Sequence, residues 1–369
     1  MPAGRTDEKL RFRWSNARAA NGVLSSAAAE PVSGPRMRRT LADCYYVAMS
    51  LQLNAIFDVV TVGRAVVDMY PAEDGRAPKD VVSYNQYLGG SPTNVAVAAA
   101  RTGLRSAVVT RTGADLFHDF IRSQLDSFGV DTRWVCSSPA RRTTLAVCDL
   151  HEPHEPALTF FRDARPPEDD LVAAELQEAA DAAGILWITA SGFASEQSAE
   201  AHTAALGSAR RVFLDLDHRP DFWPSEAALR ERVRPVLAQA DAVVGNVREA
   251  EIALGISASP RELARELLNR GARVAVIKEG ARGAIAATGD ELFEQSSFPV
   301  RTINGLGAGD AFGGQLLRGE SAGWPLDQTL RHAAAAGAIV ASRRGCSVAM
   351  PTADEITDFL ASHTRPRQR

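Results

Sequence analysis

Residues 300–314 read VRTINGLGAGDAFGG, in which a glycine-rich segment precedes an aspartate and a helical pattern follows it. Small residues in front of a helix let the backbone approach a ligand, and the helix N-terminus adds a partial positive charge. The segment therefore predicts an anion-binding loop in which Asp310 can take a proton from a hydroxyl group. The simpler alternative is a glycine-rich turn with Asp310 as an N-cap, and a motif this short does not decide between the two.

The composition is typical of a soluble α/β protein. The chain has 369 residues, of which 45% are hydrophobic, enough for one large domain or two smaller ones. Its formal net charge is -4 and the arginines are scattered among acidic residues, so we expect no nucleic-acid partner. No apolar run approaches the ~18 residues of a membrane span, so we expect no membrane partner. The four cysteines are widely spaced without a Cys-x-x-Cys pair, which favours reduced thiols in the cytoplasm.

Residues 1–54 differ in composition from the rest of the chain. They are rich in arginine and small residues and show no sustained periodicity, a pattern that can resemble an organelle transit peptide. Acidic residues within the segment count against a transit peptide, and no secretory hydrophobic stretch appears near the start. We therefore predict a disordered extension over 1–54, one ordered domain over 55–360 and a short tail over 361–369.

From residue 56 onward, strand and helix patterns alternate along the chain. An apolar, β-branched run at 56–63 predicts a buried strand. Further strands are predicted at 107–112, 184–189, 212–216, 242–244 and 274–277, and helices at 115–129, 173–183, 195–208, 227–240 and 260–270. Repeated β-α units of this kind predict a parallel sheet whose two faces are covered by helices.

Two extended runs at 143–150 and 158–162 surround the sequence HEPHEP at 151–156. The pattern predicts a β-hairpin with a polar tip. The tip could also be taken for a metal site, but its two prolines favour a solvated turn. We expect the hairpin region, about 143–163, to form a small β lid together with residues 64–90.

Polar and small residues also surround a helix predicted to begin near Pro92 and to continue through the apolar run at 95–100. Asp68 stands just past the first strand, where ligands of parallel sheets gather, although a turn or cap residue is an equal alternative. Gly89 and Gly90 permit close approach of a ligand in front of the helix. Asn94 is a polar residue in the first turn of an otherwise apolar helix, so it is either a packing or capping residue or a ligand for a polyol.

Two later strands end in residues suited to phosphate chemistry. Asn246 and Glu249 lie on one face at the start of a helix, where such a pair can hold a Mg²⁺-bound water; a capping box is the alternative. Lys278 follows another strand and precedes Gly280 and Gly283, a turn suited to phosphate groups or a plain hairpin turn. Several such sites on successive strand ends favour a shared functional site over chance.

A rival reading rests on Asp215 and Asp217, two carboxylates directly after an apolar strand. A phosphatase of the haloacid dehalogenase type needs an Asp-x-Asp pair at such a place, with Asp215 as the nucleophile. The threonine that usually follows this pair is missing, and the pair lies far along the chain. The phosphatase class is therefore the weaker alternative.

Taken together, these elements resemble the ribokinase-like (PfkB) carbohydrate kinases over residues 56–355. The matching elements are Gly-Gly-x-x-x-Asn at 89–94, Asn-x-x-Glu at 246–249, Lys-x-Gly-x-x-Gly at 278–283 and Gly-Ala-Gly-Asp at 307–310. The resemblance implies a ribokinase-like three-layer α/β/α sandwich with a mostly parallel central sheet and a small β lid.

The resemblance also implies a role for each element. Asp310 would be the general base that activates a primary hydroxyl, with the amides of Gly307, Ala308 and Gly309 as the anion hole. Adenine would lie near the helix at 335–341 and the turn at 345–347. The remaining roles are sugar binding by Asp68, Gly89, Gly90 and Asn94, contact with substrate or transferring phosphate by Arg162, ATP-phosphate binding by Asn246, Lys278, Gly280 and Gly283, and Mg²⁺ binding through water by Glu249.

Three further sequence stretches resemble those of the kinases of myo-inositol catabolism: 87–94 (YLGGSPTN), 214–223 (LDLDHRPDFW) and 349–352 (AMPT). This implies ATP-dependent phosphorylation of the primary hydroxyl of a sugar acid, 2-deoxy-5-keto-gluconate. A fructokinase, a 2-keto-3-deoxygluconate kinase and a non-catalytic sugar sensor are the alternatives. The substrate carboxylate calls for an arginine partner. Four arginines are candidates for that partner: Arg64, Arg162, Arg165 and Arg219.

One departure from the family pattern concerns monovalent cations. Many relatives carry Asp-Thr-Thr directly before Gly-Ala-Gly-Asp, and that segment helps to hold a cation. Here the positions are Asn304, Gly305 and Leu306, so a carboxylate and two hydroxyls are lost. We therefore predict weak or absent activation by K⁺. The resemblance is also compatible with a homodimer formed through the lid.

Overall fold

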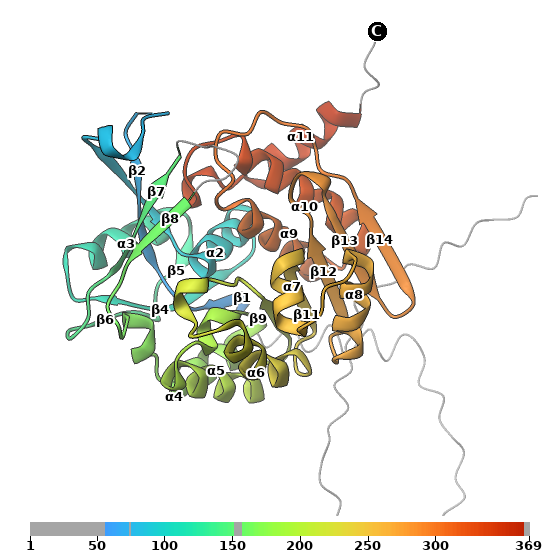
Figure 1. Cartoon of the computed structure of the whole chain (residues 1–369), viewed down its shortest axis with the longest axis horizontal. Helices are drawn as coiled ribbons and strands as arrows, with labels where there is room; N and C mark the ends of the chain where they lie inside the picture. Colours follow the sequence, from blue (N-terminus) through green and yellow to red (C-terminus); the bar gives the residue numbers. More distant parts are fainter. Residues whose placement is uncertain (1–55, 74, 151–156, 365–369) are drawn as a thin grey trace, which may run out of the picture.

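A computed structural model describes residues 56–73, 75–150 and 157–364 of the chain (Figure 1). The predicted extension over 1–54 and the hairpin tip at 151–156 lie outside the described residues. Helix α11 (Ala353–Thr364) runs past residue 360. The ordered domain therefore continues into the segment that the sequence assigned to a tail.

A ten-stranded sheet forms the middle layer of the domain. The strands lie in the order β14-β13-β12-β11-β10-β9-β1-β4-β5, and β6 also pairs with β4. All pairs from β12 to β5 are parallel, and only the β12–β13 and β13–β14 pairs of this sheet are antiparallel. The strands are β1 (Phe57–Val62), β4 (Ser106–Gly113), β5 (Val130–Asp131), β6 (Val135–Ser138), β9 (Ala183–Thr189), β10 (Val212–Asp215), β11 (Ala242–Asn246), β12 (Val274–Lys278), β13 (Ala284–Thr288) and β14 (Glu291–Gln295).

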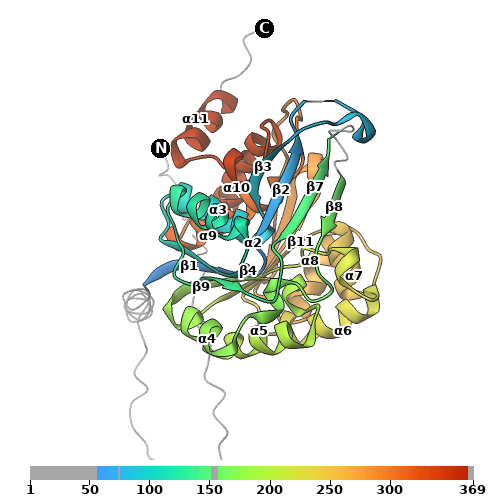
Figure 2. The same ribbon diagram turned by 90° about the vertical axis from the view of Figure 1, so that its left-hand side faces the viewer.

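Helices cover both faces of this sheet, as the alternating pattern predicted (Figures 1 and 2). One layer contains α4 (Ala173–Ala182), α5 (Glu196–Ser208), α6 (Glu226–Leu237), α7 (Val247–Leu254) and α8 (Pro260–Asn269). The other contains α2 (Ser91–Arg101), α3 (Leu116–Ser127), α9 (Ala308–Ala322), α10 (Leu326–Ala341) and α11. Short 3-10 helices lie at Pro78–Asp80, Pro167–Asp170, Ala190–Phe193, Pro220–Phe222, Gly280–Arg282 and Ser347–Ala349. None of the helices within the described ranges is long and apolar enough to cross a bilayer.

The core explains why the central strands are apolar throughout rather than alternating. On β9, Leu186 packs in the cluster under α4 to α8, whereas its neighbour Trp187 packs in the cluster under α2 and α9. Both side chains are essentially fully buried. A strand covered on two faces must bury both sets of side chains, which is the pattern of parallel sheets in α/β proteins. The helical pattern after Asp310 is split into α9 and α10, because Gly323 ends α9 in a left-handed conformation and Pro325 caps α10.

A second sheet, here called the lid, has the order β3-β2-β7-β8. It consists of β2 (Val66–Pro71), β3 (Tyr84–Gly89), β7 (Thr144–Asp149) and β8 (Ala157–Phe161). The β7–β8 pair is the predicted antiparallel hairpin, and β2 pairs in parallel with β7. Figure 2 shows these four strands side by side, standing away from the central sheet. The predicted small β lid is therefore present.

Candidate active site

The predicted site residues converge at one edge of the central sheet. Parallel neighbours β10, β11 and β12 end at Asp215, Asn246 and Lys278, so these three residues meet at the carboxyl edge. The Nζ atom of Lys278 lies 3.6 Å from Oδ2 of Asp215. Helix α9 begins at the same edge and presents Asp310, and two pockets open on either side of that helix start.

The first, called the small pocket, lies between the lid and the starts of α2 and α9. It brings together six predicted site residues from distant parts of the sequence, Asp68, Gly90, Asn94, Arg219, Gly307 and Asp310, as well as the candidate Arg64. Its other lining residues are Val66, Ser91, Leu158, Phe160, Leu306 and Cys346. Leu158 and Phe160 come from β8, so the lid forms one wall of the pocket.

Asp310 lies in the first turn of α9, but it is not the N-cap. Gly307 is the N-cap, with a φ of 81° that favours glycine. The side-chain oxygens of Asp310 accept hydrogen bonds from Oγ of Ser91 and Nδ2 of Asn94, each at 2.8 Å. Burial, and then the nearby Asp217 carboxylate, raise the pKa of Asp310 to about 6. The first N–H groups of a helix have no acceptor inside it. A carboxylate that could act as a base therefore lies beside a helix start whose free N–H groups could bind an anion.

Gly89 and Gly90 make room for groups of the protein itself, and the expected close approach of a ligand to them stays a prediction. A Cβ atom on Gly89 would overlap the Asp68 carboxylate. Gly90 has a φ of 97°, and a Cβ atom there would lie 2.5 Å from the backbone oxygen of Arg64. Gly90 lines the small pocket, whereas Gly89 is not among its lining residues in the described structure. Asp68 is buried, and this burial raises its pKa to about 7.

Two arginines share one carboxylate at the wall of the small pocket. Nη2 of Arg64 donates to Oδ2 of Asp217 at 2.8 Å, and Nη2 of Arg219 lies 2.7 Å from Oδ1 of the same residue. Burial alone would raise the pKa of Asp217, but Arg219 and Arg64 hold it well below its usual range. Arg64 also donates through Nη1 to Oγ of Ser191 at 2.6 Å. The sequence named Arg64 only as one of four carboxylate candidates, and no motif separates it from the others.

The other two candidate arginines lie elsewhere. Arg162 forms an ion pair with Glu168 at 3.0 Å, and its guanidinium carbon lies 3.8 Å from the ring centroid of Phe222. Arg165 has a side chain that is 53% exposed, and its nearest carboxylate, at 4.0 Å, is that of Asp170. Neither lines the small pocket in the described part of the chain. The guanidinium group of Arg162 is held by Glu168 and Phe222, and its predicted contact with substrate stays a prediction.

The second, called the large pocket, has a volume of about 690 Å³ and lies between the Lys278–Gly283 turn, α9 and α10. The predicted Lys278, Gly280 and Gly283 line it. So do Ala281, Ser297, Phe298, Pro299, Val300, Thr302, Gly305, Ala308, Gly309, Phe312, Ala334, Gly337, Ala338 and Ala341. The turn is the hairpin turn between β12 and β13, which confirms that alternative, and its contact with phosphate stays a prediction. The lining segment 297–299 was missed, because it has no regular pattern.

The two segments expected near adenine line different pockets. Cys346 lines the small pocket, not the large one. Ala338 and Ala341 do line the large pocket, together with Gly337, whose added Cβ atom would lie 3.2 Å from the backbone oxygen of Ala308. Of the two segments expected near adenine, only α10 reaches the large pocket.

Asn246 and Glu249 form a complete capping box at the start of α7. Oδ1 of Asn246 accepts from the Glu249 amide at 2.9 Å, and Oε2 of Glu249 accepts from the Asn246 amide at 2.7 Å. Glu249 is half-buried, and desolvation raises its pKa to about 7 although Lys278 opposes the shift. No group of three or more histidine, cysteine or acidic residues in the described ranges is arranged to hold a metal ion. The pair suits an indirect contact with Mg²⁺ through water better than direct ligation.

The same geometry weighs against the phosphatase alternative. Asp215 faces Lys278, and both side-chain oxygens of Asp217 are bound by arginines. Such a phosphatase needs a free nucleophilic carboxylate and a direct metal site, and the described residues offer neither arrangement.

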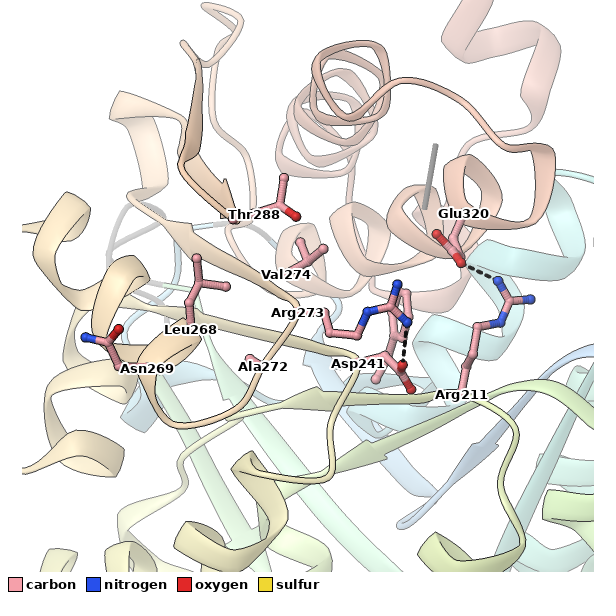
Figure 3. A pocket seen from close by; sticks show the side chains of 11 residues that line it. Arg211, Asp241, Leu268, Asn269, Ala272, Arg273, Val274, Thr288 and Glu320 are labelled. Atoms are coloured by element: carbon pink, nitrogen blue, oxygen red, sulfur yellow. Dashed lines mark hydrogen bonds and ion pairs between the residues drawn. The ribbon is translucent and has the colours of Figure 1, made fainter. Parts of the chain in front are cut away.

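A third cavity, of about 380 Å³, lies at the opposite edge of the sheet, where β10 and β12 begin. Figure 3 shows Arg211 directed at Glu320 and Arg273 directed at Asp241 in this cavity. Arg273 and Asp241 lie 3.3 Å apart. Because Glu320 is near the end of α9, the Arg211 pair ties the helix that carries Asp310 to the start of β10. The cavity's charged groups are thus paired with one another.

A helix start with free N–H groups beside a carboxylate, under a small β-sheet, is an arrangement that suits phosphoryl transfer to a hydroxyl group. Residues 57–353 match the pfkB family of carbohydrate kinases. The chain therefore belongs to this family and is a carbohydrate kinase.

Individual relatives agree with this assignment. The 5-dehydro-2-deoxygluconokinase of Geobacillus thermodenitrificans is 30% identical over 316 residues, which span 82% of this chain and 93% of that protein. A fructokinase from Vibrio cholerae O395, solved with fructose, ADP and calcium, is 27% identical with a TM-score of 0.74, covering 83% of this chain and 99% of its own. A fructokinase from Xylella fastidiosa, solved with ATP, is 25% identical with a TM-score of 0.71, covering 84% and 99%.

Proposed function

We propose that this carbohydrate kinase transfers the γ-phosphoryl group of ATP to the primary hydroxyl, O6, of 2-deoxy-5-keto-gluconate, a sugar acid of myo-inositol catabolism. The observation that carries the proposal is the pair of arginines on Asp217, at the wall of the pocket that also contains Asp310. The similarity to the 5-dehydro-2-deoxygluconokinase of Geobacillus thermodenitrificans supports the same substrate.

The charges at this wall favour an acidic sugar. Arg64 and Arg219 carry two positive charges and share the carboxylate of Asp217. The two carboxyl groups that line the same pocket, Asp68 and Asp310, have pKa values raised to about 7 and about 6, which reduces the negative charge they place there. The Nε atoms of both arginines are buried and have no hydrogen-bond partner among the described residues. A buried donor without an acceptor costs about 1–3 kcal/mol, so a carboxylate bound beside the two guanidinium groups would be stabilised. A neutral ketose offers hydroxyl groups but no charge, which makes a fructokinase the weaker alternative.

In the proposed reaction, Asp310 accepts the proton of the sugar's primary hydroxyl as its oxygen attacks phosphorus. The N–H groups at Gly307, Ala308 and Gly309 point at the position of the transferring phosphoryl group and stabilise its negative charge. Lys278 stands next to this loop, since a Cβ atom on Gly309 would lie 3.3 Å from its Nζ atom. Leu158 of the lid makes one wall of the pocket apolar, which helps to exclude water during transfer.

The large pocket is the proposed site of ATP. Its volume suits a nucleotide, and Lys278, Gly280 and Gly283 border the end nearest the anion loop. The fructokinase relatives with bound ATP and ADP support a nucleotide site on this fold. Mg²⁺ bound to the ATP phosphates would neutralise charge that develops during transfer. Glu249 and Asn246 are the residues that would hold it, through water.

The first test is ADP release from Mg-ATP with a panel of 2-deoxy-5-keto-gluconate, 2-keto-3-deoxygluconate, fructose and ribose. We expect strong preference for the first. Turnover of fructose alone would favour the fructokinase alternative. ADP release with none of the four sugars would rule out 2-deoxy-5-keto-gluconate as the phosphoryl acceptor. The variant Arg219→Met should raise KM for the acid by ~10²-fold and change KM for fructose much less. Arg165→Met, which removes an exposed arginine near the lid, is the matched control and should change neither.

A homodimer through the lid is the assembly that accompanies this proposal. β8 is an edge strand of the lid, and its Phe161 is 59% exposed. An exposed apolar residue on an unpaired strand edge favours pairing with a second copy. Phe161→Glu should therefore shift the elution volume on size-exclusion chromatography to that of a monomer. An unchanged elution volume would argue against the lid as the interface.

A further inference from the structure

Asp310 is held by a chain of hydrogen bonds that reaches beyond its direct neighbours. Oγ of Ser347 donates to Oδ1 of Asn94 at 2.6 Å, and Nδ2 of Asn94 donates to Oδ2 of Asp310 at 2.8 Å. Ser91, on the same face of the first turn of α2, donates to the other oxygen of Asp310 at 2.8 Å. Ser347, Asn94 and Ser91 are all buried. We propose that these three residues form a positioning relay for the Asp310 carboxylate, with Ser347 as its outer member.

The relay gives Asn94 a second task besides the sugar contact expected of it. A carboxylate only accepts hydrogen bonds, so the amide nitrogen of Asn94 must face Asp310. The amide oxygen then points to Ser347, whose hydroxyl must be the donor. Nδ2 carries two hydrogens, and only one of them is used by Asp310. The other remains available for a sugar hydroxyl, so one amide group can tie the position of the sugar to that of the base.

Ser347 matters because it satisfies the amide oxygen. In a Ser347→Ala variant the buried Oδ1 of Asn94 would lose its donor, and the amide would rotate towards another one. Asp310 would then be held only through Ser91. Small displacements of a catalytic group have large effects on rate, although Ser347 itself touches neither Asp310 nor the expected position of the transferring phosphoryl group. Ser347 is thus a positioning residue rather than a catalytic one.

The experiment uses the full chain and the variants Ser347→Ala and Ser91→Ala. The matched control is Ser198→Ala, because Ser198 is also a buried serine and bonds to His202 in α5, on the other face of the sheet. We expect kcat of both relay variants to fall at least ~10-fold, with an added rise in KM for the sugar in Ser347→Ala because the Asn94 amide rotates, while Ser198→Ala keeps the parent kcat and KM. A larger KM at constant kcat would mean that the serines serve sugar binding, and would overturn the relay.

A second readout needs no sugar, so it separates the relay from the proposed function on which it rests. Both hydrogen bonds to Asp310 favour its charged form, so their loss should raise its pKa further. The pKa can be followed by ¹³C NMR of aspartate-labelled protein, with the signal identified by its disappearance in Asp310→Asn. A raised pKa in Ser91→Ala and Ser347→Ala, but not in Ser198→Ala, is the expected result. The same pKa in all variants would overturn the relay even if every sugar in the panel were phosphorylated.

Discussion

Replacing Asp310 with asparagine should make the protein more stable at neutral pH while it abolishes most of the activity. Burial and the neighbouring Asp217 raise the pKa of Asp310 from 3.8 to about 6, so the charged form is disfavoured in the folded state. Between pH 3.8 and about pH 6, the Asp310 carboxyl group binds more protons in the folded protein than in the unfolded chain, because its pKa is higher in the folded state. Stability therefore falls as pH rises from about 4 to about 6, and the deficit persists above pH 6.

The size of the stability effect follows from the same shift. A rise of the pKa from 3.8 to about 6 corresponds to about 3 kcal/mol of destabilisation by the charged group at pH 7.5. Asparagine removes this charge, but its NH2 group cannot accept one of the two hydrogen bonds from Ser91 and Asn94, at a cost of about 1 kcal/mol. The net expectation is about 2 kcal/mol of added stability at pH 7.5, and a melting temperature higher by roughly 3–5 °C.

Differential scanning calorimetry at pH 7.5 and pH 4.5, paired with ADP release, checks both halves of this prediction. At pH 4.5 the stability gain should shrink, because wild-type Asp310 is then mostly protonated. Turnover of the variant should be lower by ~10²–10⁴-fold. For the wild type, kcat/KM should rise about tenfold per pH unit below pH 6 and level off above it. A variant that is less stable than the wild type at pH 7.5, or that keeps near-normal turnover, would refute the reasoning.

Three further predictions concern the surroundings of the base. Lys278→Met removes the cation beside the anion loop, so ADP release should fall by ~10²-fold; unchanged kinetics would place Lys278 outside the transfer step. Gly89→Ala puts a methyl group onto the Asp68 carboxylate, so KM for the sugar should rise in steady-state assays while KM for ATP stays constant. Replacing Na⁺ with K⁺ at equal ionic strength should leave turnover unchanged, because the buried Asn304 amide already donates to the Gly345 carbonyl at 3.3 Å. Strong K⁺ activation would contradict this.

Most of the fold could be predicted because its strands and helices carry clear periodic patterns. The parallel direction of the strands, the two helical layers and the lid hairpin follow from apolar runs and turn residues. The antiparallel strands at the sheet edge did not emerge, since β13 (sequence AIAAT) is rich in alanine, a residue that favours helices over strands. The strands β5 and β6 are too short, at 2 and 4 residues, to show a period.

Site residues could be predicted where they stand at the end of a helix or strand. They could not be predicted where the position of a long side chain depends on its partners. Asp310, Asn94 and Lys278 are placed by the start or end of a helix or strand, so their convergence follows from the topology. Arginine side chains span several bonds, and their final position depends on partners from elsewhere in the chain. Arg162 and Arg64 both have a guanidinium group near the ring of Phe222, yet only Arg64 reaches the small pocket.

The arginines at the small pocket have a consequence for the base as well as for the substrate. The pKa of Asp310 is already raised by Asp217, and a sugar carboxylate bound nearby would add a further negative charge and raise it again. Arg219 opposes this effect, because its charge interacts favourably with both Asp217 and Asp310. The pKa of about 6 already belongs to a site that contains Arg219, so a bound acid would raise the pKa of Asp310 from that value. The same guanidinium groups that favour an acidic sugar therefore limit how far the bound acid shifts the pKa of the base.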